Sequence, residues 1–351
     1  MHFESDNSSP AHPSVLEALT RANEGYAGSY GGDDLTARVR DRIRELFEAP
    51  EAAVYFVATG TAANALGLAT ICDPYQTNLC HPIAHIEEDE CGAPEFYTGG
   101  AKLTHVPGEN GKIDERALAR AIANNRKGFV HAVQPGPLSI SQATETGTVY
   151  SLGELMALTG QARDAGMQVH MDGARFANAL VSLDLSPAEM SWKAGVDVLS
   201  FGGTKNGLLA AEAVVIFDPE QAWEFELRRK RAGHLFSKYR FLSAQFEAYL
   251  ADDLWLKLAG HANAGAGAMA EALSSVDGVN LLYPPDANMV FFEAHADVHR
   301  ALQAAGARYH LWPAGASLDG AGDAPVAARL VSGWATTEAE IAAFVAALKA
   351  V

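Results

Sequence analysis

The chain has 351 residues, of which 48% are hydrophobic and 20% charged, an ordinary globular composition with enough apolar material for a core. The length allows one large domain or two. The formal net charge is −17, from 43 acidic and 26 basic side chains. It argues against nucleic acid and anionic membranes as partners, because both require clustered Lys and Arg.

The cysteines and the N-terminus indicate where the protein works. Cys72, Cys80 and Cys91 cannot all pair and none forms a C-x-x-C motif, so we expect reduced thiols. The first six residues, Met-His-Phe-Glu-Ser-Asp, lack the basic flank and apolar run of a signal peptide. No stretch approaches the roughly 18 apolar residues that span a bilayer. We therefore expect a soluble, cytoplasmic protein.

The first half of the chain alternates short apolar runs with longer periodic segments. Leu35, Val39 and Ile43 share one helical face, and the run AVYFV reads as a buried strand. The same rhythm predicts strands at 53–57, 102–106, 129–133, 167–171, 196–200 and 213–217, and helices at 35–47, 62–71, 114–125 and 152–165. Such alternation is typical of an α/β fold with a mostly parallel sheet covered by helices on both faces.

The pattern changes after Asp218-Pro219. A charged, helix-prone region runs from about 219 to 275 and is interrupted near Gly233. Beyond it the periodicity predicts strands at 279–283, 288–293 and 329–332, and helices at 295–305 and 337–349. We expect an N-terminal arm and large domain over residues 1–245, and a smaller α/β domain over residues 246–351.

Ligands of an open parallel sheet bind beyond the carboxyl ends of its strands, so the residues after each strand are the candidates for chemistry. The first candidate is Thr59-Gly60-Thr61, which opens a helix. Free backbone N–H groups and the helix dipole favour a phosphate there, although an ordinary capped turn has the same residues. Neither G-x-G-x-x-G nor a Walker lysine is present.

Two further candidates follow later strands. Asp172 lies in Met171-Asp172-Gly173-Ala174-Arg175, where it either caps a helix or pairs with a pyridinium nitrogen. Lys205 lies in Gly202-Gly203-Thr204-Lys205, directly after an apolar strand. Most lysines are surface residues, but a lysine at a sheet end between glycines is suited to form an imine with an aldehyde cofactor.

The fourth candidate is His81-Pro82-Ile83-Ala84-His85, followed by the acidic run 87–90. Histidines spaced i, i+4 on a helix can bind a metal, but Pro82 disfavours helical geometry across this pair. His85 can instead stack on an aromatic cofactor. Taken together, the four segments predict a phosphate cradle, a ring-nitrogen acid and an imine lysine in chain order.

At these positions the sequence resembles the L-threonine aldolases, which are pyridoxal phosphate (PLP) enzymes of the aspartate-aminotransferase fold. The resemblance runs from Ser5-Asp6 through Tyr30-Gly31-Gly32-Asp33-Asp34, Thr59–Asn64, His85 and Asp172–Arg175 to Lys205 and Arg329. The loop at 233–240 is similar to that of the low-specificity branch. The family is usually dimeric or tetrameric, with its sites at a dimer interface.

The resemblance implies a role for each matching residue. Lys205 would hold PLP as a Schiff base, Asp172 would pair with its ring nitrogen, and His85 would stack on the ring. The phosphate would lie against Gly60, Thr61 and Thr204, and against Lys238 or Arg240 of a neighbouring subunit. Ser5, Arg175 and Arg329 would bind the substrate carboxylate, with Arg175 also bordering the cofactor. The expected reaction is cleavage of L-threonine, L-allo-threonine and related β-hydroxy-α-amino acids to glycine and an aldehyde.

The group that takes the hydroxyl proton stays open. His85, Glu90 and a water held by them are candidates, and Glu145 stands where many relatives carry a second histidine. Alternatives within PLP chemistry are an aldolase that prefers aryl substrates such as phenylserine and, more distantly, a β-eliminating lyase or a transaminase. From other classes, a metal-dependent hydrolase using His81, His85 and the acidic run remains, as does a non-catalytic binding protein.

Overall fold

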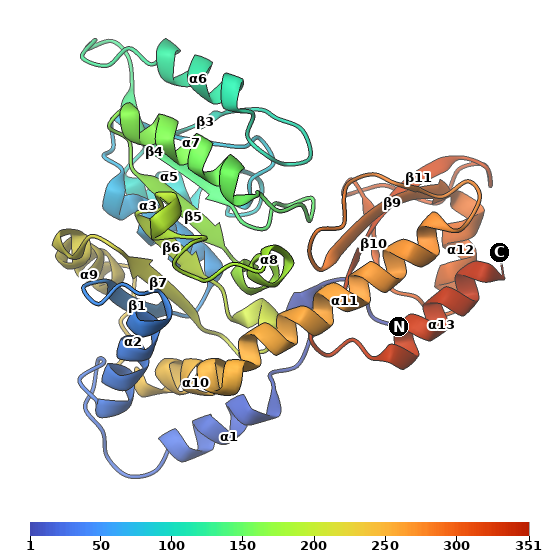
Figure 1. Cartoon of the computed structure of the whole chain (residues 1–351), viewed down its shortest axis with the longest axis horizontal. Helices are drawn as coiled ribbons and strands as arrows, with labels where there is room; N and C mark the ends of the chain where they lie inside the picture. Colours follow the sequence, from blue (N-terminus) through green and yellow to red (C-terminus); the bar gives the residue numbers. More distant parts are fainter. Residues whose placement is uncertain (351) are drawn as a thin grey trace.

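The computed structural model describes residues 1–350 and is built around two separate sheets (Figure 1). The larger sheet has seven strands in the order β1-β7-β6-β5-β4-β2-β3. The strands are β1 (Ala53–Val57), β2 (Gln76–Cys80), β3 (Lys102–His105), β4 (Gln134–Ser141), β5 (Val169–Gly173), β6 (Val198–Phe201) and β7 (Glu212–Ile216). Only β7 runs antiparallel to its neighbours, so the other six strands end at one common edge.

Helices cover both faces of this sheet, and one of them is apolar all round. This helix, α3 (Gly60–Ile71), follows β1 and packs on β5 and β6; its residues from Ala62 to Ala69 are all buried. A helix buried on every side needs such a composition, and Asn64 is its one buried polar side chain. The other helices of this part are α1 (Pro13–Ala22), α2 (Asp34–Leu46), α4 (His85–Glu88), α5 (Ala93–Thr98), α6 (Glu115–Asn124), α7 (Leu152–Asp164), α8 (Phe176–Leu183), α9 (Ala222–Arg231) and α10 (Arg240–Leu250).

The second sheet is antiparallel and has the order β10-β11-β9-β8. Its strands are β8 (Asn280–Leu281), β9 (Met289–His295), β10 (His310–Trp312) and β11 (Pro325–Val331), with helices α12 (Ala296–Ala304) and α13 (Glu338–Lys349). The long helix α11 (Leu254–Ser274) runs from the large sheet to the small one (Figure 1). It supplies Trp255 to the first hydrophobic core and Met269 to the second, which also contains Phe3 from the N-terminus.

The structure confirms the predicted fold class, a mostly parallel sheet with covering helices and a smaller α/β unit after it. One predicted strand, 129–133, is wrong: Phe129 and Val130 are exposed, and the strand begins at Gln134. Its sequence Gln-Pro-Gly-Pro reads as a turn, yet Gly136 lies so close to β2 that an added Cβ would stand 2.6 Å from the Thr77 carbonyl oxygen. Strands β2 and β10 were not predicted. Within residues 1–350, no helix is long and apolar enough to cross a membrane.

Candidate active site

The polar groups expected to perform chemistry lie at the carboxyl edge of the large sheet. Asp172, near the end of β5, is paired with Ser141 of β4 and Ser200 of β6. Lys205 lies in the 3-10 turn Thr204–Asn206, four residues after the end of β6. His85 begins α4 after β2. Because these strands are parallel, their ends meet, and the sheet brings together residues that are far apart in the sequence.

A buried amide joins two carboxylates at this edge. The Nδ2 group of Asn64 donates to Oε1 of Glu90 and to Oδ2 of Asp172, each at 2.9 Å. The other Asp172 oxygen, Oδ1, accepts from the Ala174 backbone N–H at 2.9 Å. His85 Nδ1 contacts the same Glu90 Oε1 at 2.8 Å. Asn64 is the last residue of the Thr59–Asn64 motif. Its role was not predicted from the sequence, because its two partners lie 26 and 108 residues away.

Electrostatics keep Asp172 charged. Burial alone would raise the pKa of its carboxyl, but the charges of His85 and Lys205 and the Ala174 N–H hold that pKa below its usual value. The pKa of His85 is raised, mainly because Glu90 accepts its hydrogen bond. Burial raises the pKa of Glu90. The edge therefore presents a fixed negative charge at Asp172 beside an imidazole that is readily protonated.

Beneath Asp172 on the same face of β5 lies His170, which is fully buried. Its ring nitrogens contact Ser139 Oγ at 2.9 Å and Ser200 Oγ at 3.1 Å, one residue from each neighbouring strand. Burial lowers the pKa of His170 to about 4, so the ring is neutral at pH 7. This network ties together the three strands that support Asp172.

The turn that carries Lys205 is held from both sides. Gly203 N–H donates to Oε2 of Glu212 on β7 at 2.7 Å. Asn206 Nδ2 donates to the Tyr249 hydroxyl and to the Trp255 carbonyl, each at 2.8 Å. Lys205 itself is partly accessible between these anchors.

The start of α3 is open, as a phosphate cradle requires. Thr59 caps the helix by accepting from Ala62 N–H at 3.1 Å, and an added Cβ on Gly60 would meet no atom within 4 Å. Thr61 is partly exposed at the same turn. The Thr204 hydroxyl, predicted to contact the phosphate, accepts from Ala211 N–H at 3.2 Å, and its contact with the phosphate stays a prediction.

The two predicted carboxylate-binding arginines differ in their partners. Arg175 donates to both oxygens of Asp6, from Nε at 2.7 Å and from an Nη at 3.0 Å, and both residues are buried. Arg329 makes one long bond, from an Nη to the Glu4 carbonyl at 3.3 Å, and its buried Nε has no partner among residues 1–350. Arg329 therefore has donors free for a ligand. Arg175 is already paired with Asp6, for which no role was predicted from the sequence.

Glu145 faces the same space. Burial raises the pKa of its carboxyl, while the charges of Lys205 and Arg175 oppose that rise. A cavity of about 10 Å³ lies beside it, lined also by His81, Ser139 and Tyr150. That volume is close to what a single water molecule occupies.

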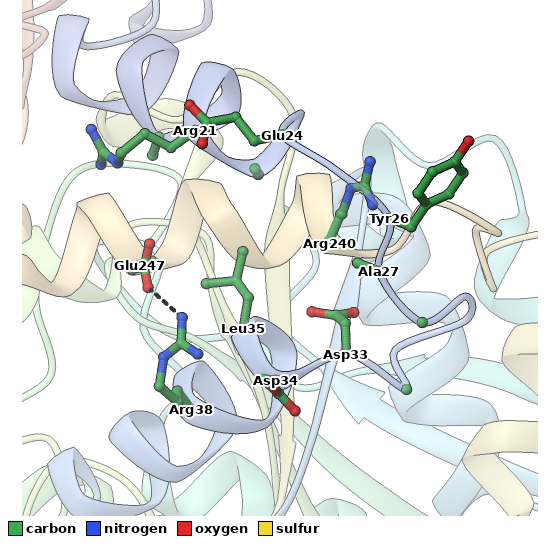
Figure 2. Close-up of a pocket in the computed structure, with 14 residues that line it drawn as sticks. Arg21, Glu24, Tyr26, Ala27, Asp33, Asp34, Leu35, Arg38, Arg240 and Glu247 are labelled. Atoms are coloured by element: carbon green, nitrogen blue, oxygen red, sulfur yellow. Dashed lines mark hydrogen bonds and ion pairs between the residues drawn. The ribbon is translucent and has the colours of Figure 1, made fainter.

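Ser5 lies between Glu4 and Asp6, the residues that Arg329 and Arg175 contact, and its Oγ accepts from the Asn7 backbone N–H at 3.2 Å. Two other predicted groups, Lys238 and Arg240, have no hydrogen bond or ion pair with the site residues in residues 1–350. Lys238 is exposed. Arg240 lines a separate pocket of about 560 Å³ between α1, α2 and α10, which contains the Arg38–Glu247 pair at 3.4 Å (Figure 2). The chain alone does not bring Lys238 or Arg240 to Lys205.

The metal pair considered from the sequence does not form in the described part of the chain. The ring nitrogens of His81 contact the Gly108 carbonyl at 3.2 Å and Ile83 N–H at 3.3 Å. The ligand-type atoms that do meet, within 4.8 Å of one another, belong to His85, Glu90 and Asp172. The Asn64 amide already bridges Glu90 and Asp172. This bridge holds the Asp172 carboxylate in position to bind another group.

The donor set fits pyridoxal phosphate. A buried charged carboxylate, an imidazole, a lysine and an open helix start suit its ring nitrogen, ring face, aldehyde and phosphate, respectively. Among residues 1–350, buried polar atoms without a partner remain at this site: Asn64 Oδ1 and Glu90 Oε2 at the edge of the large sheet, and Nε of Arg329 on β11 of the small sheet. Unpaired buried atoms are uncommon in folded proteins and are expected where a ligand completes the site.

Comparisons with known proteins identify the family of this chain. The model of the family described as Beta-eliminating lyase matches residues 2–297. A low specificity L-threonine aldolase of Pseudomonas aeruginosa is 46% identical over 308 residues, 88% of each chain, and one of another Pseudomonas strain is 41% identical over 99% of this chain and 97% of its own. The threonine aldolase structure of Leishmania major superposes with a TM-score of 0.91 at 30% identity, covering 99% of this chain and 98% of that one. The chain therefore belongs to the Beta-eliminating lyase family, within which it groups with the low specificity L-threonine aldolases.

Proposed function

We propose that this protein cleaves L-threonine, L-allo-threonine and related β-hydroxy-α-amino acids to glycine and an aldehyde, with PLP as cofactor. The observation that carries the proposal is the charged, buried Asp172 at the sheet edge that also bears Lys205. The curated relatives are named for threonine, which favours that substrate over the aryl alternative.

The proposed cofactor contacts follow from the donor set. Asp172 would hold the ring nitrogen, His85 would cover the ring, and the open turn at Gly60 and Thr61 would hold the phosphate. Lys205 would hold the aldehyde carbon. When bound, PLP supplies an electron sink for the electron pair released at the substrate Cα. Asn64 contributes by locking Asp172 and Glu90 in place, so that neither carboxylate rotates away from its partner.

Substrate orientation is assigned chiefly to Arg329. Its guanidinium is half-buried and keeps free donors, and a guanidinium fork matches a carboxylate. The neighbouring Arg175 adds positive charge but has two donors committed to Asp6. Two arginines close together favour an anion between them, because burial and the charge of Arg175 lower the pKa of Arg329 and a carboxylate relieves that repulsion.

Removal of the hydroxyl proton is assigned to the carboxylate and imidazole groups that face Lys205. Glu145 and Glu90 both have pKa values raised by burial, which makes each a better proton acceptor than an exposed carboxylate. His85 is bonded to Glu90, so a proton taken by the imidazole is stabilised by that carboxylate. Glu145 has no hydrogen bond to Glu90 or His85, and we favour it as the acceptor of the hydroxyl proton.

The partner and cellular context are part of the proposal. We infer a homodimer or homotetramer in which Lys238 or Arg240 reaches the phosphate of a neighbouring subunit, because Lys238 is exposed and Arg240 lines a pocket that contains none of the proposed site residues of its own chain. The three cysteines are free, which suits a reducing cytoplasm. We propose a division of the chain at residues 245 and 246, which falls inside α10 (Arg240–Leu250), the helix that precedes α11.

Product identity tests the proposal. The purified protein with PLP is given L-threonine, L-allo-threonine or L-phenylserine, and aldehyde, glycine and ammonia are measured from each. The proposal predicts acetaldehyde and glycine in equal amounts from both threonine isomers, with no effect of a chelator. Ammonia with a keto acid would indicate elimination, cleavage of phenylserine alone would indicate an aryl aldolase, and loss of activity with chelator would indicate metal dependence.

A further inference from the structure

A buried carboxylate lies directly behind the turn that carries Lys205. Glu212 is the first residue of β7, whose other four residues are apolar and fully buried, and Glu212 is itself only 7% exposed. In the sheet it pairs with Val57 of β1. A buried carboxylate is costly unless its oxygens accept hydrogen bonds, so its presence in this strand needs a reason.

The hydrogen bond to this carboxylate comes from that turn. Gly203 N–H donates to Oε2 at 2.7 Å, and the hydroxyl and backbone N–H of the neighbouring Thr204 act to lower the pKa of the carboxyl. The charge of Lys205, the next residue, faces it as well. Burial raises the pKa of Glu212, while these donors and Lys205 oppose the rise; the other titratable group that faces it is Tyr249.

The turn has little freedom to rearrange around another partner. An added Cβ on Gly202 would stand 2.4 Å from the Ala174 carbonyl oxygen, and one on Gly203 would stand 2.8 Å from the Ala211 carbonyl oxygen. The backbone before Lys205 is therefore packed against the residue that follows β5 on one side and the residue that precedes β7 on the other. On the far side of Lys205, Asn206 is bonded to Tyr249 and Trp255.

We propose that Glu212 is a positioning residue for Lys205, holding the Gly203–Thr204 backbone so that the lysine amine projects from a fixed point at the sheet edge. The inference rests on the proposed function, in which Lys205 forms an imine. In that step the amine adds to the aldehyde carbon, a C=N bond forms, and the carbonyl oxygen leaves as water. A carboxylate offers both of its oxygens to the N–H groups of this turn, whereas an amide of the same shape offers one oxygen and turns its own N–H donors toward them.

The test uses Glu212→Gln, with Glu154→Gln as the matched control. Glu154 also accepts from a backbone N–H, that of Ser151 at 2.7 Å, and from a lysine, Lys112 at 3.0 Å, but it lies on α7 away from Lys205. Three quantities are measured for the apo-protein: its unfolding midpoint, the rate of imine absorbance on mixing with PLP, and the fraction of Lys205 reduced to a secondary amine by borohydride, read by peptide mass.

We expect Glu212→Gln, with native circular dichroism, to form the imine at least about 10-fold more slowly, whereas Glu154→Gln forms it at the wild-type rate. If Glu212→Gln does not fold, Glu212→Asp serves, because its carboxylate is one methylene too short to reach Gly203 N–H at the same distance, and the same slowing is expected. A wild-type rate in whichever variant folds would overturn this inference alone. A wild-type protein without any reduced adduct at Lys205 would overturn the proposed function and this inference with it.

Discussion

The buried ion pair between Asp6 and Arg175 is expected to contribute to stability far more than its exposed counterparts. Asp6 is 2% exposed and accepts from Arg175 at 2.7 and 3.0 Å, and Asn288, the residue before β9, donates to it at 3.1 Å. Removing one partner of a buried pair costs roughly 3–5 kcal/mol. For Asp6→Asn we expect about 3 kcal/mol, because Asn retains one acceptor oxygen.

Chemical denaturation of the apo-protein at pH 7 measures this difference. Asp41→Asn is the matched control, since Asp41 pairs with Arg44 at the same distance of 2.7 Å but is two-thirds exposed. Exposed pairs of this kind contribute about 0–1 kcal/mol. Equal losses in the two variants would refute the argument that burial decides the value of the Asp6 pair.

The same pair sets an acid dependence. Burial would raise the pKa of Asp6, but the charges of Arg175 and Lys205 hold that pKa below its usual value. A carboxyl with a lowered folded pKa stabilises the protein above its unfolded pKa of about 3.9, and that contribution is lost as the pH falls through the folded pKa. The wild-type advantage over Asp6→Asn should therefore be constant near neutrality and shrink below about pH 4. A difference that grows on acidification would contradict this sign.

Three further changes test the site. Arg329→Lys should raise KM for L-threonine about 10-fold with a smaller change in kcat, because the guanidinium fork is lost. Steady-state kinetics measure both constants, and an unchanged KM would indicate that Arg175 binds the substrate carboxylate. Glu145→Gln should remove the acidic limb of the profile of kcat/KM against pH, since a buried base with a raised pKa becomes competent only above that pKa. An intact limb would indicate that another group accepts the hydroxyl proton. Asn64→Leu should weaken PLP binding about 10-fold, measured by titration of the apo-protein, because it leaves the Glu90 and Asp172 carboxylates facing each other unbridged.

Much of the fold was accessible from periodicity. The buried strand at 53–57 and the helix that follows it were predicted within two residues, because apolar runs and capping residues are local. Strand β4 was misplaced because its Pro-Gly-Pro start reads as a turn, and only contact with β2 explains why Gly136 is needed there. Strand β2, Gln-Thr-Asn-Leu-Cys, has too few apolar residues to be noticed outside its sheet.

The residues of the site also fall into two groups, those with a local sequence pattern and those without one. Asp172 and Lys205 were predicted because each follows an apolar strand, which is a local pattern. No role was predicted for Asp6, Asn64 or Glu212, because each bonds a residue that is distant in the sequence or on a different segment of the fold. Asp6, for example, pairs with Arg175, which is 169 residues away. The pairing of Arg175 with Asp6 also shifts the proposed carboxylate contact toward Arg329, a distinction that the residue types alone do not make.

The central claim, that Lys205 beside Asp172 is the centre of a PLP-dependent aldolase, is tested most directly by acetaldehyde release from L-threonine by the wild-type protein and by Lys205→Ala, both supplied with PLP. The account predicts equal amounts of acetaldehyde and glycine from the wild type. From Lys205→Ala it predicts neither the imine absorbance nor more than a trace of product, although the fold is native by circular dichroism. Normal turnover by Lys205→Ala, or a wild type that releases no acetaldehyde, would contradict it.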